Sequence, residues 1–204
     1  MRLQSFLAGV FVTVLATPAI AQNPPASPPA RIRGTVERLD GQALTLKSRD
    51  GQQVTVTLAP NVAVAFLVKK NLGDIKAGDF VASTSTKGTD GKNHSVELRI
   101  FPEAMRGLGE GQYAWDLAPE SLMTNATVSG VTGVPQGQNL KVTYKGGESE
   151  LVVGPDTPIL GYGSGDMSLL KPGAAVFIVA QKQPDGSLTA ARVTAEKDGV
   201  KPPM

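Results

Sequence analysis

The feature that most constrains the fold is an internal duplication. Ile75–Val81 (Ile-Lys-Ala-Gly-Asp-Phe-Val) matches Leu170–Val176 (Leu-Lys-Pro-Gly-Ala-Ala-Val) at an offset of 95 residues. The same offset relates two shorter pairs, Asp90-Gly91 with Asp185-Gly186 and Pro60-Asn61 with Pro155-Asp156. Chance accounts for one matching turn, but not for an ordered series along a whole unit. The sequence therefore predicts two copies of one structural unit.

The match needs two short register slips. Thr35-Val36 corresponds to Thr127-Val128 with a three-residue slip, and Arg99-Ile100 corresponds to Arg192-Val193 with a two-residue slip. We expect such slips to fall in turns, as duplicated β domains would show.

Each copy shows the alternation of half-buried strands. Val54, Val56 and Leu58 lie on one face of such a strand, and the threonines between them lie on the other. The expected strands are 35–39, 43–47, 53–58, 80–85 and 95–100 in the first copy, and 127–128, 140–144, 150–153, 175–180 and 188–194 in the second. Asp-Gly pairs between them supply the positive φ of tight hairpin turns. Residues 62–77 form either a short helix or a plain crossover.

Five strands with a longer connection between the third and the fourth follow the plan of a small closed barrel, most simply the OB type. The predicted fold class is all-β, with two tandem small OB-like β-barrels of five strands each, joined by an ordered linker, after an N-terminal signal peptide. The expected domains are a signal peptide (1–21), a flexible Pro-rich tether (22–31), a first OB-like β domain (32–101), an inter-repeat segment (102–124), a second OB-like β domain (125–196) and a loose tail (197–204).

The N-terminus has the pattern of a secretory signal. Arg2 precedes an apolar run at 6–16, and Pro18 precedes Ala19-Ile20-Ala21. Small side chains at Ala19 and Ala21 predict cleavage before Gln22. The apolar run is about half of the ~20 residues that a membrane-spanning helix needs. We expect a periplasmic or secreted protein with no transmembrane segment in its mature chain.

Composition excludes several function classes. The chain has no cysteine and one histidine, which nearly excludes thiol catalysis and zinc-type sites. Loss of Arg2 with the signal leaves 19 basic and 18 acidic residues, so a general polyanion-binding surface is not expected. We expect no nucleic-acid partner and no cofactor.

The two copies resemble the DUF5666 type of bacterial envelope domain, over residues 32–101 and 125–196. The residues that carry the resemblance are Gly34-Thr35-Val36, Ile75–Val81, Leu170-Lys171-Pro172-Gly173, and Asp185-Gly186 followed by Arg192-Val193. The resemblance implies a small OB-like barrel, often repeated behind a signal peptide. It implies no reaction, because the family has no established activity.

Residues 101–125 have no counterpart in the duplication and hold the only tryptophan. A plain linker lacks large apolar side chains. In one interpretation, the segment is held against the two domains by the burial of its large side chains, which are Met105, Tyr113, Trp115, Leu117 and Met123. In the other, the segment is a loop that meets a ligand or partner in the groove between the barrels. The candidate binding residues are Arg106, Glu110, Tyr113, Trp115 and Asp116.

Catalytic patterns are weak. His94 lies near Asp90 and Glu97, but these three residues are fewer than the four ligands of a closed metal site. No pattern in the sequence marks the oriented base or the oxyanion hole that a catalytic triad needs. The glycine clusters 107–111 and 161–165 lack the context of a phosphate-binding loop and are interpreted as turns. We predict no catalytic residue and no metal ligand.

The expected function is a non-catalytic binding or interaction module of the cell envelope, with an unknown envelope protein or small ligand as partner. One alternative is weak capture of a metal ion or small ligand at the inter-repeat segment. The other is an envelope hydrolase whose acid pair comes from Glu103, Glu110, Asp116 and Glu120.

Overall fold

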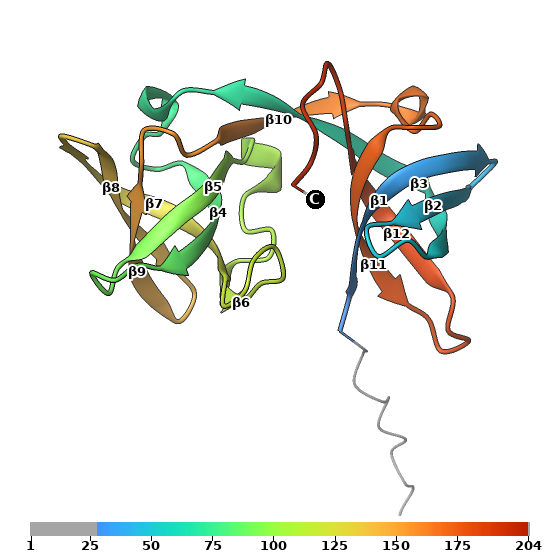
Figure 1. Ribbon diagram of the computed structural model, residues 1–204, viewed down its shortest axis with the longest axis horizontal. Coiled ribbons are helices and arrows are strands. Elements are labelled where there is room, and N and C mark those ends of the chain that lie inside the picture. Colours follow the sequence, from blue (N-terminus) through green and yellow to red (C-terminus); the bar gives the residue numbers. More distant parts are fainter. Residues whose placement is uncertain (1–27, 204) are drawn as a thin grey trace, which may run out of the picture.

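The computed structural model describes residues 28–203, which form two five-stranded β-barrels side by side (Figure 1). Barrel 1 consists of β1 (Ala30–Asp40), β2 (Ala43–Ser48), β3 (Gln53–Lys70), β11 (Ala175–Lys182) and β12 (Leu188–Ala195). Barrel 2 consists of β4 (Phe80–Lys87), β5 (Asn93–Ile100), β7 (Leu122–Val134), β8 (Gly137–Tyr144) and β9 (Gly147–Val153). The remaining elements are β6 (Gly111–Ala114), β10 (Ile159–Gly165) and the 3-10 helices η1 (Leu72–Asp74), η2 (Glu103–Met105) and η3 (Met167–Leu169).

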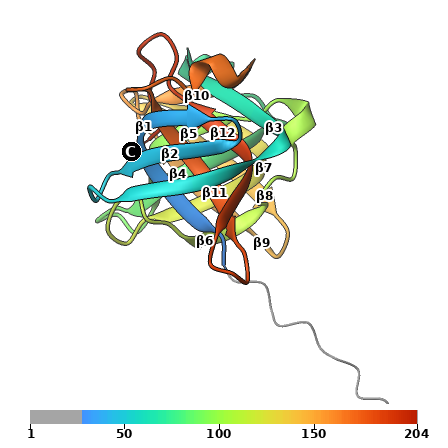
Figure 2. The same ribbon diagram turned by 90° about the vertical axis from the view of Figure 1, so that its right-hand side faces the viewer.

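Both barrels have the same strand order, which confirms the all-β, OB-like prediction. In barrel 1, three consecutive antiparallel strands β1-β2-β3 are closed by the hairpin β11-β12, with β11 antiparallel to β1 and β12 parallel to β3 (Figure 2). In barrel 2, β7-β8-β9 is closed by β4-β5, with β4 antiparallel to β7 and β5 parallel to β9. Closure removes the exposed strand edges that an isolated sheet would carry.

Each barrel takes strands from both copies of the repeat. The first three strands of one copy pair with the last two strands of the other copy. The backbone amide of Gly173 donates to the carbonyl of Val36 over 2.9 Å, and the equivalent amide of Gly78 donates to the carbonyl of Val128 over 2.8 Å. The expectation that residues 32–101 and 125–196 each close their own barrel is therefore wrong, because the closing hairpins are exchanged.

The two connections between the barrels pair with each other. β3 continues past barrel 1, and its residues 64–70 form an antiparallel ribbon with 159–165 of β10 (Figure 1). Leu67 pairs with Tyr162, and these two residues are equivalent at the offset of 95. The ribbon is thus centred on the pseudo-two-fold axis that relates the copies. The stretch 62–77 is mainly this crossover, with η1 near its end.

Strand pairing fixes the equivalence of the closing hairpins. Ser83 pairs with Leu98 in one hairpin, and Ile178 pairs with Val193 in the other. Leu98 and Val193 are therefore equivalent at the offset of 95, and the two-residue slip expected at Arg99-Ile100 is wrong.

The three-residue slip is confirmed at the start of each copy. Thr35 pairs with Ala175, and Thr127 pairs with Phe80, so that Thr35 and Thr127 occupy equivalent places.

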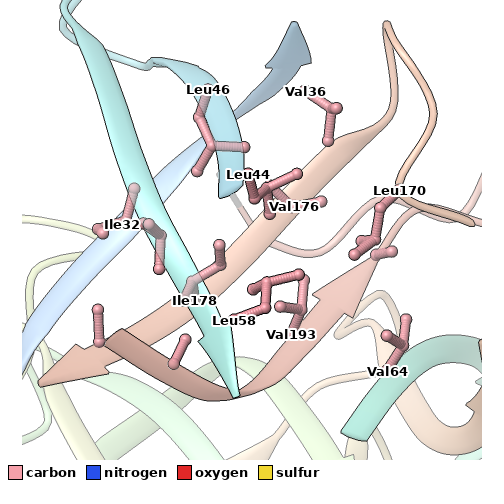
Figure 3. Packing of buried hydrophobic residues seen from close by; sticks show 14 of the residues in the cluster. Ile32, Val36, Leu44, Leu46, Leu58, Val64, Leu170, Val176, Ile178 and Val193 are labelled. Carbon is pink, nitrogen blue, oxygen red and sulfur yellow. The ribbon is translucent and has the colours of Figure 1, made fainter. Parts of the chain in front are cut away.

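Each barrel has its own apolar core, and both copies contribute to each. In barrel 1, side chains of β1–β3 interdigitate with side chains of β11, β12 and the η3 connection (Figure 3). The fully buried members of this core include Leu44, Leu46, Leu58, Leu170 and Ile178. Because each large apolar side chain contributes about 1.5–3 kcal/mol on burial, the core holds the two copies together.

Glycine has different roles in the hairpins and in the ribbon. Gly41 and Gly51 have φ values of 56° and 80°, as expected for the Asp-Gly turns. The cluster 161–165 is the extended strand β10, so its interpretation as a turn is wrong. A Cβ at Gly163 would lie 2.4 Å from the ring of Phe66, which packs across the ribbon.

The expected signal peptide, its cleavage site and tether residues 22–27 lie outside the described residues. Ala30 and Arg31, assigned to the tether, belong to β1. The C-terminal segment is not loose, because Pro202 is buried and the carbonyl of Pro203 accepts a hydrogen bond from Arg33. None of the helices within residues 28–203 has the length and apolar character needed to cross a membrane.

Candidate ligand cavity between the barrels

A cavity of about 540 Å³ lies between the two barrels. Small-molecule sites typically have ~300–1,000 Å³, so the space is large enough for one such ligand. Its walls come from the outer faces of both barrels and from the β6–β7 hairpin. Most of the lining is apolar or aromatic, including Phe101, Trp115, Met123, Tyr162 and Phe177.

The alternation of barrel 1 strands produces one wall. Ile32 and Ile178 point into the core of the barrel, so Arg31, Phe177 and Val179 point outward to the cavity. Phe177 is only 8% exposed because the cavity wall and the neighbouring segment cover it. The outer face of these strands is therefore half-buried rather than freely solvated.

The opposite wall comes from barrel 2. Ala82, Arg99 and Asn125 line the cavity and are each less than 10% exposed, at 4%, 5% and 7%. The side-chain amide of Asn125 donates to the carbonyl of Leu108 over 3.0 Å and holds the turn before β6 at the cavity rim.

The inter-repeat segment places two aromatic side chains on the cavity. Tyr113 pairs with Met123 across the β6–β7 ladder, and the backbone amide of Trp115 donates to the carbonyl of Ser121 over 2.7 Å. The rings of Tyr113 and Trp115 meet edge to face with centroids 6.1 Å apart. Arg31 lies over the Trp115 ring at 4.1 Å.

Asp116 attaches the same segment to barrel 1. Arg33, which is 3% exposed, donates to both carboxylate oxygens of Asp116 over 2.6 and 3.1 Å. Its guanidinium also lies 4.8 Å from the centre of the Phe177 ring. Partial burial opposes ionisation of Asp116, but the hydrogen bond and charge of Arg33 outweigh it and hold the pKa of this carboxyl below its usual value.

A second buried arginine belongs to barrel 2. Arg99 donates through Nε to Glu97 and through Nη1 to the Tyr162 hydroxyl. Burial raises the pKa of Glu97, although Arg99 opposes the rise. Burial disfavours the charge of Arg99, but Tyr162 and Glu97 outweigh it and raise the pKa of Arg99 above its usual value. The hydrogen bond between Arg99 and Tyr162 links the barrel 2 wall of the cavity to the centre of the ribbon formed by β3 and β10.

The structure separates the five predicted binding residues. Tyr113 and Trp115 line the cavity, and Asp116 lies beside it in the pair with Arg33. Arg106 lies outside, where it pairs with Glu103 and donates to the carbonyl of Gly78. Glu110 also lies outside and accepts the backbone amide of Lys145.

The burial interpretation and the groove interpretation each describe part of the segment. Met123 is buried, and Met105, Tyr113, Trp115 and Leu117 are half-buried. The same packing leaves a cavity against which the two aromatic residues lie. The segment is therefore both an ordered linker and one wall of the candidate site.

Sequence reasoning missed the arginines at the cavity. Arg31 and Arg33 alternate with buried Ile32, a pattern that marks the outward face of a strand, but the strand was expected to begin at Thr35. Arg99 fell within an expected strand, yet its burial depends on the second barrel and on β10. No local pattern could have predicted that burial.

His94, Asp90 and Glu97 do not converge on one point. His94 pairs with Asp90 over 3.0 Å, while Glu97 pairs with Arg99. Within residues 28–203, no group of three or more acidic or histidine side chains is placed to hold a metal ion.

Comparison of the chain with protein-family models, with curated proteins and with solved structures found no match. The resemblance to the DUF5666 type stays a prediction. Function is therefore argued from the site.

Proposed function

We propose that this chain is a non-catalytic binding protein of the bacterial cell envelope that takes a small, largely apolar ligand into the cavity between its barrels. The cavity itself carries the proposal, because about 540 Å³ of space is walled mainly by aromatic and aliphatic side chains. Leu108 and Val179 stand at its margin and are 43% and 44% exposed, so a bound apolar ligand would remove them from water.

The positions of the acidic residues favour binding over hydrolysis. Glu103 pairs with Arg106, Glu110 accepts a backbone amide, and Asp116 pairs with Arg33. Among residues 28–203, no aspartate or glutamate lines the cavity. A glycosidase-type mechanism needs two carboxyl groups on opposite sides of a substrate, roughly 5–10 Å apart.

The signal-like pattern of residues 1–21 supports a place in the envelope. There the ligand would be a small molecule of the periplasm or of the medium. The exchanged barrels then act as a rigid frame, because most of the cavity lining comes from strands.

Trp115 gives a direct test, since it is the only tryptophan and lines the cavity. The neutral apolar dye N-phenyl-1-naphthylamine would be titrated into the protein, and energy transfer from Trp115 would be recorded. We expect saturable transfer and a melting temperature that rises with dye concentration, because the dye binds only the native state.

A cavity-filling variant makes the test specific. Ala82→Phe places a large side chain in the cavity, at the position equivalent to Phe177, and is expected to abolish saturable transfer. Ala104→Phe is the matched control, because Ala104 is exposed in η2 and does not line the cavity. Undiminished dye binding by a folded Ala82→Phe protein, or no saturable binding by the native chain, would refute the proposal.

A further inference from the structure

The charges around the cavity are not balanced. Three arginines line it: Arg31, Arg99 and Arg192. Arg99 is paired with Glu97, and Arg31 lies 3.8 Å from a carboxylate oxygen of Asp116. Arg192 is half-buried and has no salt bridge with any residue in 28–203. Because Asp116 also pairs with Arg33, positive charge exceeds negative charge around the cavity, and Arg192 is left without a protein counter-charge.

The duplication explains why this charge is unpaired. With Leu98 equivalent to Val193, Arg192 occupies the position of Glu97, and Thr194 occupies the position of Arg99. At these two positions the first copy thus carries an acidic and a basic residue, Glu97 and Arg99, whereas the second copy carries one basic residue, Arg192. The two copies present opposite charges at one equivalent position beside the same cavity.

The surroundings of Arg192 suit a partly solvated anion. Gln181 and Thr189, which form a cross-strand pair in barrel 1, also line the cavity and supply neutral hydrogen-bonding groups. Because Arg192 is only half-buried, an anionic group beside it keeps part of its hydration and avoids the full desolvation cost of a buried charge. The aromatic lining of Phe101, Tyr162 and Phe177 is available for an apolar body.

From this arrangement we infer that the ligand is an anionic amphiphile, with an apolar body between the barrels and a carboxylate-type head at Arg192. The inference rests on the proposed binding function and adds the charge class of the ligand. A neutral ligand would leave the guanidinium of Arg192 without a counter-charge, and a cationic ligand would be repelled by it.

The test compares ligands that share a ten-carbon body and differ only in the head. Decanoate, decanol and decyltrimethylammonium would each displace N-phenyl-1-naphthylamine from the native protein, below their micelle-forming concentrations and at low salt. We expect decanoate to displace the dye at a concentration about tenfold lower than decanol, with the cation weaker than both. The preference should shrink with added salt, because Arg192 is only half-buried and its charge is partly screened by ions.

Arg192→Gln should remove the preference for decanoate over decanol, with both displacement concentrations compared against the affinity of the variant itself for the dye. Arg38→Gln is the matched control, because Arg38 is an exposed arginine of β1 that does not line the cavity, and it should keep the preference. Equal displacement by decanoate and decanol in the native protein, with normal dye binding, would overturn the charge assignment but not the binding function. A preference that survives in Arg192→Gln would show that another group holds the head. Failure of the dye itself to bind would instead remove the proposed function.

Discussion

Exchange of strands between the two copies predicts that the molecule survives a cut between them. A protease recognition sequence inserted after Gly107 would lie in the exposed turn that follows η2, at a residue with a φ of 81°. After cleavage, the first fragment would carry β1–β5 and the second would carry β6–β12. In tandem barrels the cut would release two folded domains. In this structure, each barrel still needs both fragments.

The size of the effect follows from the two cores. The first copy contributes ten large apolar side chains to them: Ile32, Val36, Leu44, Leu46, Val56, Leu58 and Val64 in barrel 1, and Ile75, Val81 and Leu98 in barrel 2. At about 1.5–3 kcal/mol each, their burial corresponds to roughly 15–30 kcal/mol as an upper bound. Association costs about 4–15 kcal/mol. The gain exceeds the cost over nearly all of these ranges, so we expect the fragments to stay together at micromolar concentration, which needs a dissociation constant of about 1 μM or tighter, or about −8 kcal/mol.

Size-exclusion chromatography with light scattering measures this directly. The cut protein should elute at the mass of the uncut chain, and an affinity tag on one fragment should retain the other after dilution to micromolar concentration. Six residue pairs link β1 with β11, and six link β4 with β7, so backbone ladders reinforce the cores. Separation into two species of about half the mass, each with native-like circular dichroism, would refute the exchange.

Two further predictions concern stability, measured by urea unfolding. Gly163→Ala should destabilise the protein by about 1–3 kcal/mol, because its Cβ would lie 2.4 Å from the Phe66 ring. Gly73→Ala, with open space around it, should change stability by less than about 0.5 kcal/mol, and equal losses would contradict the close packing of the ribbon. Asp116→Asn should cost about 1–2 kcal/mol, less than a fully buried pair because Asp116 is 35% exposed. Since Arg33 lowers the pKa of Asp116, this contribution is present above the usual carboxyl range and is lost as pH falls through the lowered pKa, so that the mutant and native curves should converge in acid.

Local patterns in the chain predicted the ten barrel strands, but not β6 or β10, because alternation and turn residues are local signals. Alternation at Val54, Val56 and Leu58 gave the face of β3 that enters the core, and the Asp-Gly pairs placed the hairpins. The candidate site was predictable only in part. Tyr113 and Trp115 stood out because large apolar side chains are unusual in a linker, whereas Arg106 and Glu110 resembled site residues only by charge.

The sequence by itself determined that the chain is all-β, that it contains one unit twice, and which residues of each strand face a core. Only the tertiary structure decided which copy closes which barrel, because equivalent strands of two similar copies present similar edges to a partner. The deciding element is the second half of β3, twelve residues after Leu58 that remain extended. Residues 63–66 still pair with β12 in barrel 1, and residues 67–70 then carry the chain about 13 Å further, at about 3.3 Å per residue, toward barrel 2. The duplication therefore builds one interlocked molecule, and the cavity exists because the two barrels are held against each other.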